Sequence, residues 1–588
     1  MKKSYMFMLS LAVSSLMASA QNPTLMWANN FNYLNDGGAM LANIGYNITM
    51  ASDGNLLVFN DCGTTADSQE ITFGDQVVGV GTNHGSTSYN HSMVLVKTDA
   101  QTGAALWSVY STTGDGASNN GIVAATNDGG AYMVAKLRHT AGQENNKINF
   151  VDATGANTTL DWQLANSNRY YQVAILKVNA QGAIEWYRMI DVDSAPVPGA
   201  TSAVTSDAIT IGAVTVDGDN NLYVGGRFVT SITFNNGITL TSQSSEGWDG
   251  SSQNTRGDLF IAKFDANGNY VKSMVQQGVT TSANIASMTM NAGKIYFAGY
   301  IESNNDITLG GIALAKGQGE NYRDLLVGCM DTELNVKWAK TLIDSYKGAI
   351  YNKLSVNVIG DNMWVSGKVR TNLTDAEGNN YNWSGKTRDG MLLRLNKEDG
   401  SWLGATAFGT NQAGFNGVFE SKDDANHVYV LGHVLMGNLY VQQYNIEDMT
   451  AGSQWALVDN SMDIQNCTAI CDSHNLYVMG RAGKGNTNVF YGADACVLTN
   501  TIGQNAYVAA FTLPVGINNG ANDGQGQGLL LGDVNNDGEL NISDVSAIID
   551  YLLGNPSQNF NIEAADVNGN EEVNIGDVSA LIDLLLKQ

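Results

Sequence analysis

The chain has 588 residues, with 30 Lys and Arg against 56 Asp and Glu, and its net charge of −26 excludes an extended nucleic-acid-binding surface. The same charge disfavours binding to anionic lipid. Gly is abundant at 65 residues and Pro is scarce at 5, which favours many short strands joined by tight turns. Five cysteines are too few for a disulfide framework, so we expect mainly buried free thiols, with one bridge allowed among Cys467, Cys471 and Cys496.

The chain begins with a pattern typical of a secretory signal peptide. Met1-Lys2-Lys3 is followed by an apolar run over 5–17 and by the small residues Ala18-Ser19-Ala20. We therefore predict a signal peptide at 1–20, a mature chain from Gln21, and a secreted protein that is extracellular or bound to the cell surface. The apolar run is shorter than the about 20 residues of a membrane span, and we expect no transmembrane segment further along the chain.

A strand of the form apolar-aromatic-Val-x-Gly recurs between residues 21 and 514. Its copies begin at residues 56, 131, 222, 295, 363, 428 and 476, as in Leu222-Tyr-Val-Gly-Gly226. A second mark, a Trp-containing strand, alternates with it and falls at Trp27, Trp107, Trp186, Val271, Trp338, Trp402 and Trp455, with Val in place of Trp once. Since each unit then holds four strands, we predict a mainly β protein with a seven-bladed β-propeller of four-stranded blades.

The strand Asp258-Leu-Phe-Ile-Ala-Lys-Phe-Asp265, together with the Tyr-Val-x-Gly strands, resembles a β-propeller repeat family of secreted bacterial proteins over residues 24–513. This resemblance implies the fold and does not imply a reaction. Ring closure stays open at this point. The strand of Trp27 can complete the last blade, but residues 494–498, followed by the strand at 507–511, can fill the same place.

The propeller sequence contains no recognisable catalytic motif. Among its six His, we interpret His427 and His474 as turn residues before their strands. Asp-Gly steps such as Asp53-Gly54 are typical of hairpin turns and lack the alternating ligands of a calcium loop. The repeated Trp and Tyr residues are expected to pack between blades. The candidates for an exposed aromatic contact are Trp162, Trp248 and Trp383, which lie outside the repeat.

After Leu513 a Gly-, Asn- and Gln-rich segment predicts a flexible linker at 515–530. Residues 531–588 then hold two calcium-type loops that begin 33 residues apart, each with oxygen donors at the spacing that Ca²⁺ requires. The predicted ligands are Asp533, Asn535, Asp537, Glu539 (through its carbonyl), Asn541 and Asp544 in the first loop, and Asp566, Asn568, Asn570, Glu572 (through its carbonyl), Asn574 and Asp577 in the second. Residues 532–588 contain eleven acids and a single base, Lys587.

The two loops differ at position 6. Gly538 suits the sharp turn of the first loop, whereas Glu571 in the second must adopt a backbone conformation that is costly for a non-Gly residue. We therefore expect two Ca²⁺ sites, the second weaker. Each loop runs into an amphipathic helix, and no convincing helix precedes either loop.

Both loops have Asp at position 12, and both continue as Asp-Val-Ser-Ala (544–547 and 577–580). These features make the pair resemble a type I dockerin over 531–588. The resemblance implies Ca²⁺ as cofactor and a cohesin-like domain as partner, contacted through the helices and loop positions 10 and 11. Those positions hold Ile542-Ser543 and Ile575-Gly576, where the family often has hydroxyl side chains. Recognition of a conventional cohesin therefore stays open, as does a role that only caps or anchors the chain.

Two functions are consistent with this organisation. The first is a binding protein, with a glycan or protein ligand on the propeller and a docking module behind it. The second is an extracellular polysaccharide-degrading enzyme, a glycoside hydrolase or lyase, with carboxylates from different blades at the propeller mouth. The lack of a recognisable catalytic motif favours the first.

Overall fold

The computed structural model describes residues 23–33, 46–63, 69–81, 91–113, 117–138, 147–161, 171–193, 208–244, 257–315, 322–344, 353–369, 373–374, 380–381, 389–408, 414–421, 424–433, 438–459, 461–462, 467–472, 474–482, 487–491, 496–499, 505–513, 532, 534–535, 541–555, 560–567 and 573–586. The predicted signal peptide and linker lie outside these residues. The chain divides into two compact units, residues 1–516 and 517–588. None of the described helices is long and apolar enough to cross a membrane.

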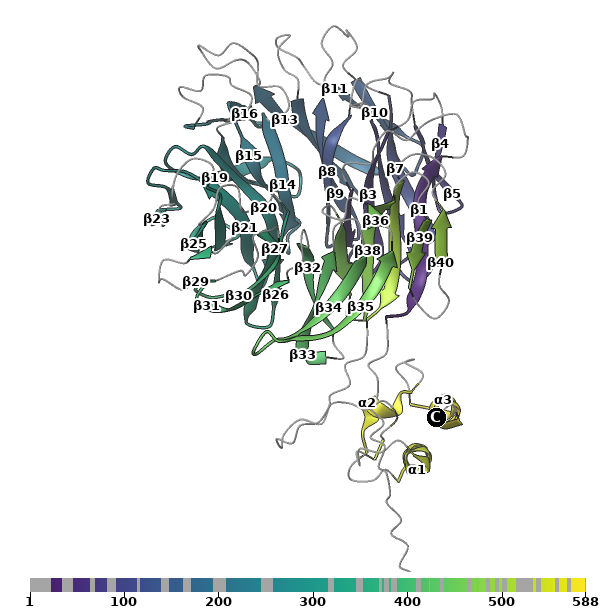
Figure 1. Cartoon of the computed structure of the whole chain (residues 1–588). Helices are drawn as coiled ribbons and strands as arrows, with labels where there is room; N and C mark the ends of the chain where they lie inside the picture. Colours follow the sequence, from purple (N-terminus) through teal and green to yellow (C-terminus); the bar gives the residue numbers. More distant parts are fainter. Residues whose placement is uncertain are drawn as a thin grey trace, which may run out of the picture. The chain divides into compact units, whose positions relative to one another are not determined.

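The first unit is a seven-bladed β-propeller, as the repeat predicted (Figure 1). With strands in order from inner to outer, the first blade is β2 (Tyr46–Met50), β3 (Leu56–Gly63), β6 (His91–Thr98) and β7 (Ala105–Thr113), the second is β8 (Ala117–Ala125), β9 (Ala131–Arg138), β12 (Tyr171–Val178) and β13 (Ile184–Asp193), and the third is β14 (Ile209–Val216), β15 (Leu222–Phe228), β18 (Asp258–Phe264) and β19 (Tyr270–Val275). The fourth blade is β20 (Ser282–Asn291), β21 (Lys294–Glu302), β24 (Asp324–Asp331) and β25 (Val336–Asp344), and the fifth is β26 (Leu354–Ile359), β27 (Asn362–Val369), β30 (Asp389–Asn396) and β31 (Trp402–Phe408). The sixth blade is β32 (Gly414–Ser421), β33 (Asp424–His433), β34 (Leu439–Asn445) and β35 (Ala451–Asp459), and the seventh is β37 (Thr468–Cys471), β38 (Asn475–Ala482), β41 (Asn505–Thr512) and β1 (Leu25–Tyr33). Each inner strand contacts the inner strands of both neighbouring blades, and the contact of β37 with β2 completes the circle.

The first strand of the chain closes the ring. β1 pairs antiparallel with β41, with Leu25 opposite Phe511 and Asn30 opposite Tyr507, so it is the outer strand of the last blade. Of the two sequence candidates for this place, the strand of Trp27 is therefore the one used. The other candidate contributes β40 (Cys496–Thr499), which belongs to a hairpin on the sixth blade.

Hairpins between the second and third strands of six blades extend the outer strand of the preceding blade, so some blades reach six strands. They are β4 (Gln69–Phe73) with β5 (Gln76–Gly81) on β1, β10 (Lys147–Val151) with β11 (Asn157–Asp161) on β7, β16 (Ser231–Thr233) with β17 (Thr239–Thr241) on β13, β22 (Thr308–Leu309) with β23 (Ile312–Ala313) bridged to Gln277 after β19, β28 (Leu373–Thr374) with β29 (Asn380–Tyr381) on β25, and β39 (Thr487–Phe490) with β40 on β35. A further short strand, β36 (Ser461–Met462), pairs with the end of β38. Each blade keeps the four strands that the repeat predicted, and the hairpins are additions contributed by the following blade. The hairpins cover outer edges that would otherwise present unpaired backbone groups.

The aromatic position of the second strand fills the space between blades. These side chains are almost fully buried in six blades: Tyr132, Tyr223, Tyr296, Trp364, Tyr429 and Tyr477. Large aromatic side chains bury about 150–250 Å² each, so they dominate the packing energy of the ring. Cys62 and Cys329 are buried free thiols and Cys471 is a half-buried one, while Cys467 is buried. The side chain of Cys496 lies outside the described residues.

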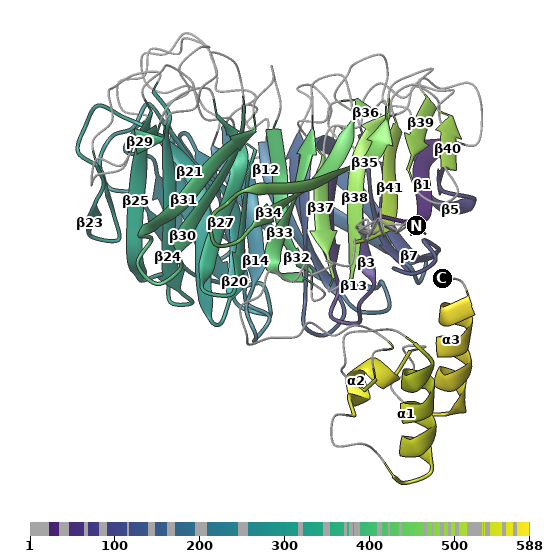
Figure 2. The ribbon, with the colours of Figure 1, turned by 60° about the horizontal axis from the view of Figure 1, so that its bottom comes forward.

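The second unit contains α1 (Ile542–Leu552), α2 (Ile562–Ala565) and α3 (Ile575–Leu586), and α1 lies beside α3 (Figure 2). Val545, Ile548, Val578 and Leu581 form its apolar core together with Val534. The single turn α2 precedes the second loop, which corrects the expectation that no helix precedes either loop. The side chain of Asn561 accepts a hydrogen bond from the Ala564 amide at 3.2 Å and so caps this turn.

Candidate functional site

Asp544, the last predicted ligand of the first calcium loop, is fully buried at the start of α1. Its Oδ1 accepts hydrogen bonds from the amides of Val534 at 2.9 Å and Asn535 at 3.2 Å, and its Oδ2 accepts one from the amide of Asn541 at 2.9 Å. Asn541 in turn caps α1 by accepting from the Ser543 amide at 2.8 Å. One carboxylate therefore joins the beginning of the loop to its end.

The second loop ends in the same way. Asp577 is fully buried, and its Oδ2 accepts a hydrogen bond from the Asn574 amide at 2.9 Å. The side chain of Asn574 accepts one from the Gly576 amide at 2.7 Å, as Asn541 does in the first loop. The structure thus places positions 9 and 12 of both loops together at a helix start.

Half of the predicted calcium ligands lie outside the described residues: Asp533, Asp537, Glu539, Asn568, Asn570 and Glu572. Glu571 lies outside them as well. The predicted ligands that the structure describes are Asn535, Asn541, Asp544, Asp566, Asn574 and Asp577. Within the described ranges, no three His, Cys, Asp or Glu side chains gather as a metal cluster.

The charge of this unit fits a divalent cation. Asp544 and Asp577 are 0% exposed, in a segment whose eleven acids face only Lys587 as a base. Burying a carboxylate costs several kcal/mol unless a counter-charge and hydrogen bonds compensate. Since the unit supplies one basic side chain, a bound cation with carboxylate and carbonyl oxygen ligands is the natural compensation, and this donor set suits Ca²⁺.

The two helices expose much of their apolar surface. Ile542 and Ile575, at position 10 of the two loops, are 70% and 69% exposed. Other exposed apolar side chains of the unit are Ile549, Leu552, Leu553, Ile562 and Ile582. The amphipathic pattern therefore overstated the core, because so small a unit cannot cover every apolar side chain. Large exposed apolar side chains of this kind are typical of interaction sites.

Of the two His residues interpreted as turn residues, His474 directly precedes β38, whereas His427 lies within β33, which corrects the turn interpretation for His427. His427 contacts Asp424 through Nδ1 at 2.7 Å, and the His474 amide donates to Asp472. Gly54 has a φ of 79°, and Asp53 before it pairs with Lys97 at 2.6 Å. Partial burial raises the pKa of Asp53, but the hydrogen bonds and the charge of Lys97 lower it overall. The possible aromatic contacts Trp162, Trp248 and Trp383 lie outside the described residues.

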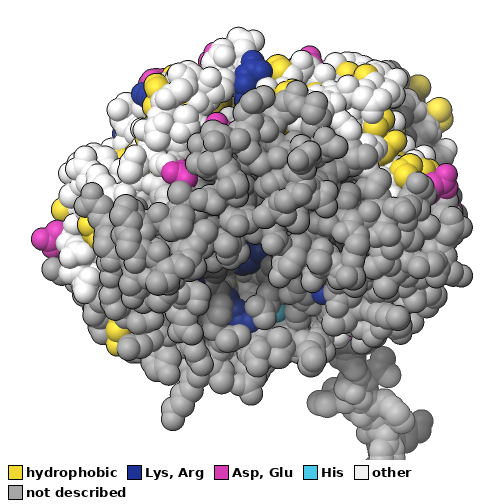
Figure 3. Space-filling model, turned by 90° about the horizontal axis from the view of Figure 1, so that it is seen from above, with side chains coloured by type: hydrophobic (Ala, Val, Ile, Leu, Met, Phe, Trp, Pro, Cys, Tyr) yellow, Lys and Arg dark blue, Asp and Glu magenta, His cyan; other side chains and the backbone are white. Residues whose placement is uncertain are grey.

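One set of residues was not predicted from the sequence, namely the residue that follows the Gly of each second strand, or follows Asn60 or Ala135 where these replace the Gly. We call these seven residues the ring positions: Asp61, Lys136, Arg227, Tyr300, Lys368, His433 and Arg481. Comparison of the seven repeat copies one residue further would have found them, because four are Lys or Arg in a strongly acidic chain. Figure 3 shows a hollow in which dark-blue Lys and Arg side chains and a cyan His side chain lie, while the visible acids lie outside it.

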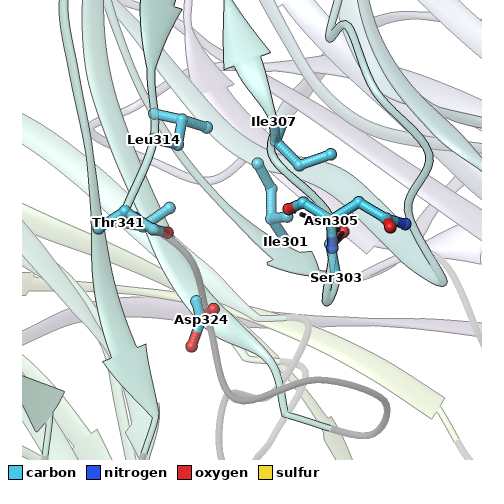
Figure 4. A pocket seen from close by; sticks show the side chains of 8 residues that line it. Ile301, Ser303, Asn305, Ile307, Leu314, Asp324 and Thr341 are labelled. Carbon is cyan, nitrogen blue, oxygen red and sulfur yellow. Dashed lines mark hydrogen bonds between the residues drawn. The ribbon is translucent and has the colours of Figure 1, made fainter.

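A pocket in the fourth blade is too small to be a substrate site. It lies beside β21 and the hairpin of β22 and β23, and its open space of about 220 Å³ is below the usual range of ligand pockets (Figure 4). Ser303 and Thr341 in its lining already donate to backbone carbonyls, at 3.0 and 2.9 Å. Asp324 is the one carboxylate in the lining, so the pocket offers no pair of acids for glycoside hydrolysis.

Residues 531–586 match the family model of the dockerin type I domain. No curated protein matches the chain. Among solved structures, the chain is similar to a quinohemoprotein alcohol dehydrogenase from Pseudomonas putida, with 12% identity, 92% of this chain and 83% of that chain covered, and a TM-score of 0.36. It is also similar to a protein of unknown function from Dyadobacter fermentans, with 10% identity, 84% and 98% covered, and a TM-score of 0.35. The C-terminal unit is therefore a type I dockerin domain, which is a calcium-binding domain, joined to a seven-bladed propeller.

Proposed function

We propose that the protein is a secreted binding protein, extracellular or on the cell surface. Its propeller takes up a glycan or protein ligand, and its dockerin domain binds Ca²⁺ and attaches the propeller to a cohesin-like domain of a partner. The observation that carries this proposal is the duplicated closure by Asp544 and Asp577, each buried at a helix start in a domain of the dockerin type.

The twelve predicted oxygen donors are proposed as the ligands of two Ca²⁺ ions. Within this chain, Asp544 and Asp577 hold the loop ends against α1 and α3, and bound Ca²⁺ would compensate their charge. Because Glu571 replaces Gly at position 6, the second site is the weaker one. Calcium binding is thereby coupled to the folding of the surface that meets the partner.

The proposed docking surface is formed by Ile542, Ser543, Ile575 and Gly576. It is supported by the exposure of the two Ile side chains and by their equivalent places in the two loops. Apolar residues in both copies would favour a cohesin surface that is more apolar than one that recognises hydroxyl side chains.

Among the residues that the structure describes, no arrangement of acids favours the enzymatic alternative. Only one of the seven ring positions, Asp61, is an acid, whereas glycoside hydrolysis uses a pair of carboxyl groups. The pocket in the fourth blade likewise contains a single acid.

Docking is tested by measuring binding of the full chain to a panel of immobilised type I cohesin domains in Ca²⁺. The double variant Ile542→Asp with Ile575→Asp is expected to bind about 100-fold more weakly, since charges would enter an apolar contact. The matched control is Ile562→Asp, an exposed Ile of α2 outside the proposed surface. Equal binding by the double variant and the control would contradict the assigned surface, and failure of every cohesin to bind would contradict docking itself.

A further inference from the structure

The seven ring positions lie at the same end of every blade. Each follows the Gly or its counterpart in a second strand, and each is paired with one of the first three residues of the third strand in its blade. The propeller symmetry therefore brings these seven residues into one circle on one face of the ring.

This circle is basic although the protein is acidic. Lys and Arg account for 30 of the 588 residues, yet they occupy four of the seven ring positions, whereas the 56 acids supply only Asp61. Such a reversal is not expected from random placement. Clustered cations within low-dielectric walls focus the local field and raise the concentration of anions there.

The ring positions of the third and fourth blades, Arg227 and Tyr300, are linked across their blade boundary through Ser282. Nη1 of Arg227 donates to Oγ of Ser282, the first residue of the next inner strand, at 3.2 Å, and that hydroxyl lies 3.4 Å from the Tyr300 hydroxyl. The guanidinium of Arg323 stacks over the Tyr300 ring at 4.8 Å. Arg323 is thus one further cationic group beside the ring position of the fourth blade, and it also pairs with Glu302 at 3.6 Å.

His433 has hydrogen-bonding capacity left among the described residues. Its side chain is 1% exposed, and neither ring nitrogen has a hydrogen-bond partner among the described residues. Its imidazole occupies the space that a side chain at Gly414 would take, at the start of the inner strand β32. Burial and then the charge of Lys368 lower the pKa of His433 to about 3, so the ring is neutral at pH 7 and can donate one hydrogen bond.

We propose that the ring positions form an anion-binding site at one mouth of the propeller, which takes a ligand bearing carboxylate or sulfate groups, such as an acidic oligosaccharide. This inference rests on the proposed function, because it specifies the ligand class of the propeller. Lys136, Arg227, Lys368 and Arg481 supply the positive charge. The neutral His433 adds a hydrogen-bond donor.

The test is isothermal titration of the full chain with a galacturonate tetramer, a chondroitin sulfate tetrasaccharide and the neutral cellotetraose. The acidic ligands are expected to bind at least about tenfold more tightly than cellotetraose, and their affinity is expected to fall as NaCl is raised. Competition by sodium sulfate separates a site for free anions from one that needs the saccharide as well.

Single Lys→Met variants at ring positions, Lys136→Met and Lys368→Met, keep the length of the side chain and remove its charge. Each variant that retains the circular dichroism spectrum of the native chain is expected to bind the acidic ligand about tenfold more weakly or worse. The matched control is Lys272→Met on the outer strand β19, whose affinity should stay within about twofold because its partner Glu333 lies outside the ring positions.

Unchanged affinity in a folded ring variant, equal binding of cellotetraose, or no binding of either acidic ligand would each overturn the proposal. If Lys136→Met and Lys368→Met both fail to fold, the proposal is tested on the native chain alone, by comparing its affinity for the acidic ligands with its affinity for cellotetraose. Cohesin binding, measured on the same proteins, is expected to be unaffected by the ring variants. Failure of the anion site and failure of docking are therefore distinguishable.

Discussion

The indole nitrogen of Trp27 donates a hydrogen bond to the backbone carbonyl of Ala100 at 2.9 Å. The two residues belong to the last and the first blade, so this bond joins the ends of the ring. The same bond recurs between other neighbouring blades, from Trp107 to Ala180 at 2.9 Å and from Trp338 to Lys397 at 3.0 Å. Ring closure therefore uses the contact that joins blades elsewhere.

Removal of β1 is predicted to open the ring. A chain that lacks residues 21–33 loses the buried Trp27 and Phe31 and leaves the edge of β41 unpaired. The free energy of unfolding should fall by about 5 kcal/mol, since each large buried side chain contributes about 1.5–3 kcal/mol. Urea unfolding measures this, with a chain that begins at Pro23 as the control. Equal stability of the two chains would show that β1 does not close the ring.

Gly103 in the turn of the first blade is predicted to be essential for the packing of Trp27. Its φ is 75°, and an added Cβ would lie 2.7 Å from the Trp27 ring. Gly103→Ala should lower the free energy of unfolding by about 3 kcal/mol, through backbone strain and overpacking together. Gly155→Ala is the control, because Gly155 has a φ of 81° but open space around it, so only about 1 kcal/mol of strain applies. Equal losses of unfolding free energy in Gly103→Ala and Gly155→Ala would show that contact with Trp27 does not contribute to the effect at Gly103.

Acid is predicted to weaken the fourth blade through Asp331. Partial burial raises the pKa of Asp331, but hydrogen bonds from Lys337 at 2.7 Å and from Asn335 outweigh it and hold the pKa well below its ordinary value. A pKa that is lower in the folded state gives stability that is present above the ordinary value and is lost as pH falls below it. Asp331→Asn should cost about 1 kcal/mol at pH 7, and its stability should then change less between pH 7 and pH 3.

Asn is a suitable replacement at position 331 because Asn179 and Asn396 hold the equivalent turns in other blades. Urea unfolding at the two pH values gives the comparison. Parallel pH profiles for the native and variant chains would contradict a role for the Asp331 carboxylate.

The second calcium site is predicted to bind Ca²⁺ more tightly when the residue at position 6 of its loop is replaced by Gly. Glu571→Gly supplies the residue that position 6 favours, and a gain of about 1–2 kcal/mol corresponds to about a tenfold lower dissociation constant. Calcium titration of the full chain should show two binding steps, of which only the weaker moves. Asp544→Asn, which affects the first loop, is the contrasting variant. A shift of the tighter step by Glu571→Gly would reverse the assignment of the two sites.

The propeller could be predicted because Tyr-Val-x-Gly strands and Trp strands keep their order around the ring. The added hairpins were missed, although Ile71-Thr-Phe73 and Ile232-Thr-Phe234 repeat a strand pattern in the long connections. The sixth blade lacks this hairpin because only residues 434–438 separate β33 from β34. Closure by Trp27 could not be decided, since pairing with β41 depends on contacts between the two ends of the chain.

The calcium loops were easier to predict, because ligand spacing within twelve residues is a local property. The positions of Asp544 and Asp577 at helix starts agree with that spacing. The exposure of Ile549 and Leu552 could not be read from the helical pattern, which does not show how many faces a small unit can cover. The ring positions were missed because their meaning depends on bringing seven blades together.

The central claim is that Ca²⁺ holds the dockerin domain in the form that attaches this protein to its partner. The most direct measurement is the affinity of the full chain for a cohesin-like domain in Ca²⁺, after removal of Ca²⁺ with a chelator, and after its return. We predict binding that is lost with the chelator, restored with Ca²⁺, and abolished in the double variant Asp544→Ala with Asp577→Ala. Binding that survives chelation unchanged would contradict the account.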